Sequence, residues 1–249
     1  MILFRSIIPL ALSIVTLISC SDDNSKPENV SKVQVALKTN TNPVLLKNNH
    51  TEMLVLEKFQ INISEIEFDI DDEMEDQILN GDSVYGPTEF NGPFLIDLLS
   101  DEATAGLSLG VANLPTAVYE EVEFEFDVYS ADVTQEIFGS SVYIKGTYDT
   151  TPFIIKSDEE WDIEIGFINP EGYSLTGADS KLWIDFNLQR IKDQLNSIDF
   201  NAAKDKNGNG IIEIDSADTD GNIHLLENFI EALEDAFEVE EADDTDEDN

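Results

Sequence analysis

Apolar and polar residues alternate with a period of two along much of the chain between residues 32 and 188. The clearest alternation runs over 121–128, where Val and Phe take the even positions and Glu and Asp take the odd ones. A period of two is typical of a strand that buries one face and leaves the other in water. We therefore expect a strand here with one apolar face and one acidic face.

A shift in this alternation lies near Ser64-Glu65. Apolar residues keep one phase from Phe59 to Ile63 and resume one residue later at Ile66. One extra residue in a strand is typical of a β-bulge, which bends the strand. The pattern therefore predicts a bulge or kink at this point.

Other segments continue the same pattern. Val33, Val35 and Leu37 stand among polar neighbours, and further strands are expected at 141–148, 153–156, 161–167 and 182–186. Gly and Pro residues punctuate the segments between them. Many short strands separated by turn signals favour an antiparallel β-sandwich. We predict a mainly β domain of this kind over residues 32–188.

The periodicity becomes helical after Phe186. Leu188, Ile191 and Leu195 have helical spacing, and a second apolar stripe begins at Ile223 and continues through Leu226, Ile230, Leu233 and Phe237. We predict a helical extension over 189–237 that packs against the sandwich. The remaining segment, 238–249, is nearly all acidic and is predicted to be disordered.

The first residues carry a targeting pattern. Arg5 precedes an apolar run of about a dozen residues, which is shorter than the about 20 that a membrane-spanning helix needs. A basic residue before a short apolar core is typical of a signal peptide. Leu17-Ile18-Ser19-Cys20 resembles the lipobox of bacterial lipoproteins, in which the Cys is acylated. The alternative is a plain secretory signal.

This resemblance implies a signal peptide at 1–19, a lipid on Cys20 and a tether at 20–31. Ser21-Asp22-Asp23 resembles the acidic signal that follows the acylated Cys in surface lipoproteins of the Bacteroidota. The alternative is an ordinary acidic linker. We expect a protein that is anchored by lipid in the outer membrane and exposed at the cell surface.

Charge narrows the classes of partner. The 249 residues include 13 basic and 53 acidic ones, and the formal net charge is −40. Such a chain repels the phosphates of nucleic acid, so we exclude nucleic-acid binding, and it attracts divalent cations. Cys20 is the only Cys. Its predicted acylation leaves no thiol for a disulfide or for catalysis.

One loop has the spacing of a metal site. Asp205, Asn207 and Asn209 stand at positions one, three and five of an EF-hand-type sequence, and Gly210 stands at position six. Calcium prefers oxygen ligands at this spacing, with a backbone carbonyl at position seven. That carbonyl would belong to Ile211. We predict calcium binding by the loop 205–216.

The loop departs from the EF-hand sequence at position twelve. A bidentate Glu is usual there, whereas this chain has Ser216. We expect Asp215 or Asp218 to supply the missing carboxylate, with Asp220 and Asn222 as further oxygen donors nearby. The alternative is a surface turn rich in Asn, Gly and Asp that binds no metal.

Four short phrases together resemble an uncharacterised family of bacterial lipoproteins. They are Ile61-Asn62-Ile63-Ser64-Glu65-Ile66-Glu67, Phe94-Leu95-Ile96-Asp97-Leu98-Leu99, Leu114-Pro115 followed by Tyr119-Glu120-Glu121-Val122, and Ile184-Asp185-Phe186-Asn187-Leu188. The family is a domain of unknown function with a prealbumin-like β-sandwich. The resemblance implies that fold and an envelope location, and it brings no catalytic residues.

Other chemistry has weak support. His50 and His224 are far apart in the sequence and have no Cys beside them, so a zinc site is not expected. Five aromatic residues could form a platform for sugar, although aromatic residues on alternating strands are more often part of a core. They are Trp161, Trp183, Tyr143, Tyr148 and Tyr173.

The sequence thus predicts a non-enzymatic module that binds a partner or supports the cell envelope. A glycan or a protein is the expected partner, and calcium is expected to stabilise the fold. The alternative is a carbohydrate-active enzyme or a glycan-capturing lipoprotein of a polysaccharide-uptake system.

Overall fold

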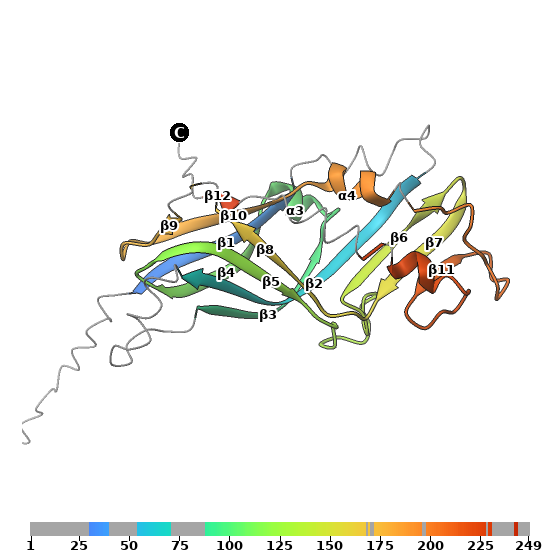
Figure 1. Ribbon diagram of the computed structural model, residues 1–249, viewed down its shortest axis with the longest axis horizontal. Coiled ribbons are helices and arrows are strands. Elements are labelled where there is room, and N and C mark those ends of the chain that lie inside the picture. The colour runs from blue at the N-terminus through green and yellow to red at the C-terminus, as the bar shows by residue number, and fades with distance from the viewer. Residues whose placement is uncertain are drawn as a thin grey trace, which may run out of the picture.

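The protein folds as two packed β-sheets with short helices (Figure 1). The computed structural model describes residues 30–39, 54–70, 88–167, 169, 172–195, 198–227, 229–230 and 242–243. The predicted mainly β class is confirmed. The predicted signal peptide, Cys20 and His50 lie outside the described residues.

The strands before residue 127 are β1 (Val30–Thr39), β2 (Leu54–Ile70), β3 (Glu89–Asp97), β4 (Leu107–Pro115) and β5 (Val118–Phe126). Those after it are β6 (Val142–Tyr148), β7 (Thr151–Ser157), β8 (Trp161–Gly166), β9 (Tyr173–Ser174), β10 (Ser180–Phe186), β11 (Ile212–Asp215) and β12 (Ala242–Asp243). The two labelled helices are α3 (Asp101–Ala105) and α4 (Leu188–Leu195). The strands predicted at 141–148, 153–156, 161–167 and 182–186 are therefore confirmed as β6, β7, β8 and β10.

Strand β2 is the centre of the larger sheet, and it contains the predicted kink. Its pairing register shifts between Ile63 and Glu65 against both β3 and β5. The bulge at Ser64 keeps Ile63 and Ile66 in the core on either side of the bend. Without the extra residue, every side chain beyond it would change faces.

The kink divides one edge of β2 between two partners. Residues 54–61 pair with β6 and residues 63–70 pair with β5, both antiparallel, so β5 and β6 lie end to end. Asn62 stands at the break, where its backbone N–H donates to the carbonyl of Ser141 and its side chain donates to that of Asp127. The segment 127–141 leaves the sheet between the two strands, and its two ends contact the buried side chain and backbone of Asn62.

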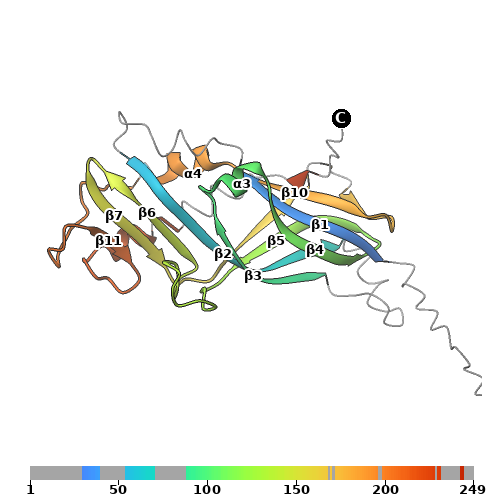
Figure 2. The same ribbon diagram turned by 180° about the vertical axis from the view of Figure 1, so that it is seen from behind.

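The smaller sheet has the order β12-β10-β1-β4 and lies over the β5 end of the larger one (Figures 1 and 2). Phe124 of β5 contacts Phe186 of β10 edge to face across the layers, with ring centroids 6.4 Å apart. At the other end, Phe200 packs on Tyr148 and Phe153 of β6 and β7. One continuous apolar core therefore runs along the molecule.

The sheets are mixed, which differs from the predicted purely antiparallel sandwich. β1 pairs in parallel with β10, and β7 pairs in parallel with β11. Both pairs join strands that are far apart in the sequence, so local patterns carry no sign of their direction. β3 and β4 were also not predicted, because β3 starts with the polar and turn-prone residues Glu-Phe-Asn-Gly-Pro.

The C-terminal region differs from its prediction in two details. The predicted helix begins at Ile223 as expected, but Ile223 is 38% exposed, and the buried residues are Leu225, Leu226, Phe229 and Ile230. The stripe is therefore displaced by about one residue around the helix. In the segment predicted to be disordered, Ala242 and Asp243 form β12 and pair with β10.

Candidate functional site

The predicted aromatic platform is largely core. Trp161, Tyr143 and Tyr173 are buried, and Trp161 stacks on Phe126 with ring centroids 3.9 Å apart. Tyr148 is half-buried on Phe200. Trp183 keeps a partly exposed ring on the smaller sheet. These side chains come from both sheets and from opposite ends of the molecule, so they form no single sugar-binding surface.

The predicted metal loop folds around the carboxylate of Asp205. Its Oδ1 accepts the backbone N–H groups of Gly208 and Asn209, and its Oδ2 accepts that of Gly210 at 2.9 Å. The side-chain oxygens of Asn207 and Asn209 accept the N–H two residues further along. Gly210 has a φ of 84°, which favours glycine. The structure therefore brings positions one, three and five together.

Glu213 joins this group, and the EF-hand-type spacing did not predict a role for it. Its Oε2 accepts the side-chain amides of Asn207 at 2.6 Å and Asn209 at 3.1 Å. Asp215 and Asp218 lie apart from it in local turns. The first accepts from Thr219, and the second accepts the N–H of Ile223.

Asp220 is the buried centre of the whole segment from 204 to 222. Its side chain is 0% exposed, and its oxygens accept the backbone N–H groups of Lys206, Asn207 and Glu213 at 3.0, 3.1 and 2.9 Å. Burial opposes ionisation, but the three N–H donors outweigh it and hold the pKa of Asp220 below its usual value. Asn222 ties the same segment to Lys204 through both of its side-chain atoms.

The loop offers carboxylate and amide oxygens, which suit calcium. These oxygens do not form a cluster of several acidic side chains. Among the described residues, no three His, Cys, Asp or Glu side chains are grouped to hold a metal ion. Asp205, Asn207, Asn209 and Glu213 would be the side-chain donors, and the carbonyl of Ile211 would be the backbone donor at position seven. Calcium binding by this loop stays a prediction.

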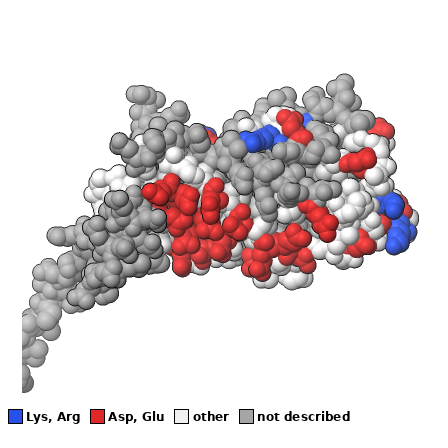
Figure 3. Space-filling model, in the orientation of Figure 1, with Lys and Arg blue, Asp and Glu red and all other residues white. Residues whose placement is uncertain are grey.

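A second candidate site is the outward face of the larger sheet. Acidic residues stand directly opposite one another across neighbouring strands, and Figure 3 shows them as one patch with no described Lys or Arg among them. One row runs Glu89, Glu67, Glu123, Glu164 over β3, β2, β5 and β8. Beside it lie the rows Glu65, Glu125, Asp162 and Asp69, Glu121. We call these residues the acidic face.

The acidic face is electrostatically strained. Like charges placed directly opposite in a sheet are destabilising. Burial, followed by the charge of the neighbouring carboxylates, raises the pKa of Glu65, Glu67, Glu121 and Glu123. The ion pairs Lys38–Asp185, Lys58–Glu136 and Lys145–Glu136 lie elsewhere.

A hollow of about 280 Å³ lies at one end of the acidic face, beside the kink in β2. Carboxylates of Glu123, Glu125, Asp127, Glu160 and Asp162 line it, together with Ser64 and the stacked rings of Phe126 and Trp161. A hollow lined by several carboxylates suits an ammonium or guanidinium group.

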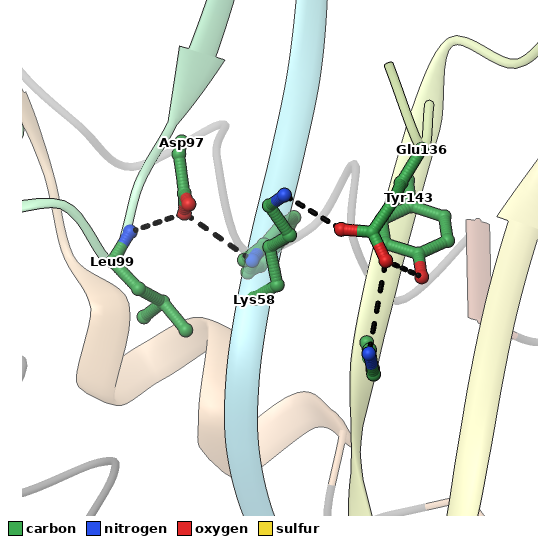
Figure 4. Close-up of polar contacts among 7 residues, drawn as sticks. Lys58, Asp97, Leu99, Glu136 and Tyr143 are labelled. Atoms are coloured by element: carbon green, nitrogen blue, oxygen red, sulfur yellow. Dashed lines mark hydrogen bonds and ion pairs between the residues drawn. The ribbon is translucent and has the colours of Figure 1, made fainter. Parts of the chain in front are cut away.

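A compact polar cluster marks the other side of segment 127–141 (Figure 4). Glu136 accepts from Lys58 Nζ at 2.7 Å and from the Tyr143 hydroxyl at 3.2 Å, and Lys145 lies 3.7 Å away. The hydrogen bond from Lys58 holds the pKa of Glu136 below its usual value despite partial burial. Glu136 therefore has two cationic partners, unlike the carboxylates of the acidic face.

The sequence predicted the part of the acidic face that lies on β5. The odd positions of 121–127 were expected to form an exposed acidic side, and Glu121, Glu123 and Glu125 lie on the outward face of β5. The alignment of Glu67, Glu123 and Glu164 was not predicted, because it depends on the pairing register of three strands. The signal available was the acidic alternation in 65–69 and in 162–164.

Comparison with protein-family models, curated proteins and solved structures finds no match to this chain. Among the described residues, no helix is both long and apolar enough to cross a membrane.

Proposed function

We propose that this protein is a non-enzymatic binding module of the bacterial cell envelope, and that its acidic face binds a cationic partner. The observation that carries the proposal is the pairing of carboxylates with carboxylates across β3, β2, β5 and β8. Such pairs oppose folding, so a chain selected for stability alone would mix in Lys or Arg. A basic partner would supply the missing positive charges.

The partner class follows from the same chemistry. A row of carboxylates extends across four strands, which suits an extended Lys- or Arg-rich protein segment better than a single small ion. The hollow lined by Glu123, Glu125 and Asp162 would take one cationic side chain. Electrostatic attraction of this kind accelerates association and weakens with salt.

Binding of a synthetic decalysine peptide tests this proposal. The test variant neutralises the central row with Glu67→Gln, Glu123→Gln and Glu164→Gln. The control variant removes as many exposed charges elsewhere, with Glu102→Gln, Asp193→Asn and Glu227→Gln. Titration calorimetry at low salt should show binding by the wild type and the control, and at least tenfold weaker binding by the test variant. Equal weakening in both variants would mean that net charge alone attracts the peptide, and it would refute the proposal.

The envelope location rests on the sequence at Leu17-Ile18-Ser19-Cys20. We propose that Cys20 carries the lipid anchor and that Ser21-Asp22-Asp23 directs the protein to the cell surface. Labelling of the bacteria with a fatty-acid analogue should mark the wild type and not Cys20→Ser. Protease added to intact cells should then degrade the protein, whereas survival until lysis would contradict surface exposure.

The fold relationship and the metal are further parts of the proposal. We propose a distant relation to prealbumin-like sandwiches. The two packed sheets support this relation, whereas the parallel pairs β1–β10 and β7–β11 depart from a purely antiparallel sandwich. We also propose that calcium binds the loop 205–216 in a structural role, because the turns around Asp205 already place three EF-hand positions together.

A further inference from the structure

At one side of the smaller sheet, β10 carries only a short edge strand, β12, from the far end of the sequence. β10 pairs with β1 along its whole length on one side. On the other side it pairs antiparallel with β12 (Ala242–Asp243), opposite Ile184 and Trp183. No described strand extends this pairing beside Ser180–Leu182. The edge therefore accepts a strand and has length for a longer one.

The outward face of the same sheet is rich in Lys, in a chain whose formal net charge is −40. Lys181 Nζ lies 3.6 Å from the centroid of the Trp183 ring, and Lys38 Nζ lies 5.4 Å from it. Cation–π attraction holds ammonium groups in such positions. The ring is fixed from another side by Gly106, where a Cβ atom would come 2.6 Å from it. Lys181 and Lys38 therefore lie around Trp183, the residue opposite β12, and Lys38 also forms an ion pair with Asp185 on the same face.

A shallow hollow continues this basic surface. Its volume is about 330 Å³, and Lys32, Lys181, Gln34 and Val111 line it, with Asp179 as the one carboxylate. It lies on the outward face of β1, β4 and β10. Lys181 stands on β10 itself, beside the edge where a strand is added, whereas Lys32 stands on the next strand, β1.

The segment that contains β12 has the complementary charge. Residues 238–249 read Glu-Val-Glu-Glu-Ala-Asp-Asp-Thr-Asp-Glu-Asp-Asn, with no basic residue. An extended peptide that joins a sheet edge gains main-chain hydrogen bonds, and its side chains decide specificity. Here the backbone pairing is seen in β12, and the charge match gives the specificity.

We propose that the edge of β10 is a docking site for an extended acidic segment, and that its occupant is the chain's own C-terminal segment 238–249. β12 is the part of this segment that pairs with the sheet. The segment covers a strand edge that would otherwise be open to other chains. An acidic peptide from another protein would have to displace it. This inference does not depend on the acidic face.

Hydrogen exchange of the β10 amides tests the pairing. The variant Ala242→Pro/Asp243→Pro/Asn249→Asp keeps the charge of the segment but removes two backbone N–H donors. Exchange in a peptide that covers β10 should be at least tenfold faster in this variant than in the wild type, with β6 unchanged as the internal reference. Equal exchange in β10 would overturn the proposal.

Charge is tested separately. Lys38→Gln/Lys181→Gln should also speed exchange in β10, whereas Lys204→Gln/Lys206→Gln, which lie on the C-terminal loop, should not. If both pairs act alike, the lysines around Trp183 do not select the segment and the proposal fails on that point.

Binding in trans distinguishes the occupants. A synthetic peptide of residues 238–249 should bind the proline variant about tenfold more tightly than the wild type, because a tethered segment competes at an effective concentration of about 1 mM. Protection of β10 that falls on dilution would mean that the segment comes from a second copy of the chain. That result would overturn the assignment within one chain.

Discussion

The acidic face and the C-terminal loop use the same residue types in opposite ways. In the loop, Asp205 and Asp220 accept backbone N–H groups, and the pKa of Asp220 is held below its usual value. On the acidic face, Glu67 and Glu123 face other carboxylates, and their pKa values are raised. The loop carboxylates therefore stabilise the fold, whereas those of the sheet oppose it. A charge that opposes folding is better explained by a task outside folding.

In the C-terminal loop, the largest loss of stability is expected from a substitution of Asp220. Asp220→Ala leaves three part-buried N–H donors without an acceptor, and we expect a loss of about 3 kcal/mol in the free energy of unfolding. Urea denaturation at neutral pH measures it. Asp220→Asn, which keeps one acceptor, should cost about half as much. A change near zero for Asp220→Ala would contradict the role given to this carboxylate.

The pH dependence of the same residue has a defined sign. Its pKa is lower in the folded protein than in the unfolded chain, so its contribution is complete above the unfolded value of about 3.8. The contribution is lost as the pH falls through the lower, folded value. The stability difference between wild type and Asp220→Asn should therefore shrink in that acidic range.

Calcium is expected to stabilise the C-terminal loop further. Extracellular calcium modules bind at about 0.1–1 mM, so about 10 mM calcium would raise the free energy of unfolding by about 1.4–2.7 kcal/mol. Thermal melts with calcium, magnesium and chelator measure this, and Asp205→Ala should abolish the rise. Equal small rises with both ions would mean only screening of charge.

On the acidic face, removal of one negative charge is expected to raise the free energy of unfolding. Glu67 faces Glu89 on one side and Glu123 on the other, so Glu67→Gln should raise the free energy of unfolding by about 1 kcal/mol at neutral pH and low salt. Glu102→Gln on α3 is the matched control and should not. A loss of stability in Glu67→Gln would contradict the repulsion.

This gain must also depend on pH. The pKa of Glu67 is raised on folding, so the folded state binds the proton more tightly. The wild type therefore gains stability as the pH falls through the folded value towards the unfolded one. The advantage of Glu67→Gln should disappear over the same range, and added salt should reduce it at neutral pH.

The smallest effect is expected in the cluster around Glu136, where charges are paired. Lys58→Gln removes the 2.7 Å contact to Glu136 and should cost about 0.5 kcal/mol, because exposed pairs contribute little. Lys145→Gln, at 3.7 Å, should cost less. A larger cost for Lys145→Gln would reverse the assignment of the main partner.

The features that could be predicted from the sequence are those that depend on residues close together in the chain. The strand with alternating Glu and the bulge at Ser64 were predicted, because both are set by neighbouring residues. The turns around Asp205 also fit their predicted spacing. The parallel pairs β1–β10 and β7–β11 were not predicted, because no local pattern records which distant strands meet.

The candidate sites also depend on contacts between distant parts of the chain, which the sequence did not predict. Asp220 was noted only as an extra oxygen donor, yet it organises N–H groups up to 14 residues earlier. Glu67, Glu123 and Glu164 belong to three strands, and only their register aligns them. The pairing of β12 with β10 was missed because composition alone predicted disorder there.

The stability of Glu67→Gln/Glu123→Gln/Glu164→Gln and its affinity for decalysine, measured at the same pH and salt concentration, show together whether the acidic face opposes folding and binds a cationic partner. If the acidic face sacrifices stability for binding a cationic partner, the variant should unfold at higher urea concentration than the wild type and lose the peptide. A variant that is more stable but binds the peptide as the wild type does would contradict the account.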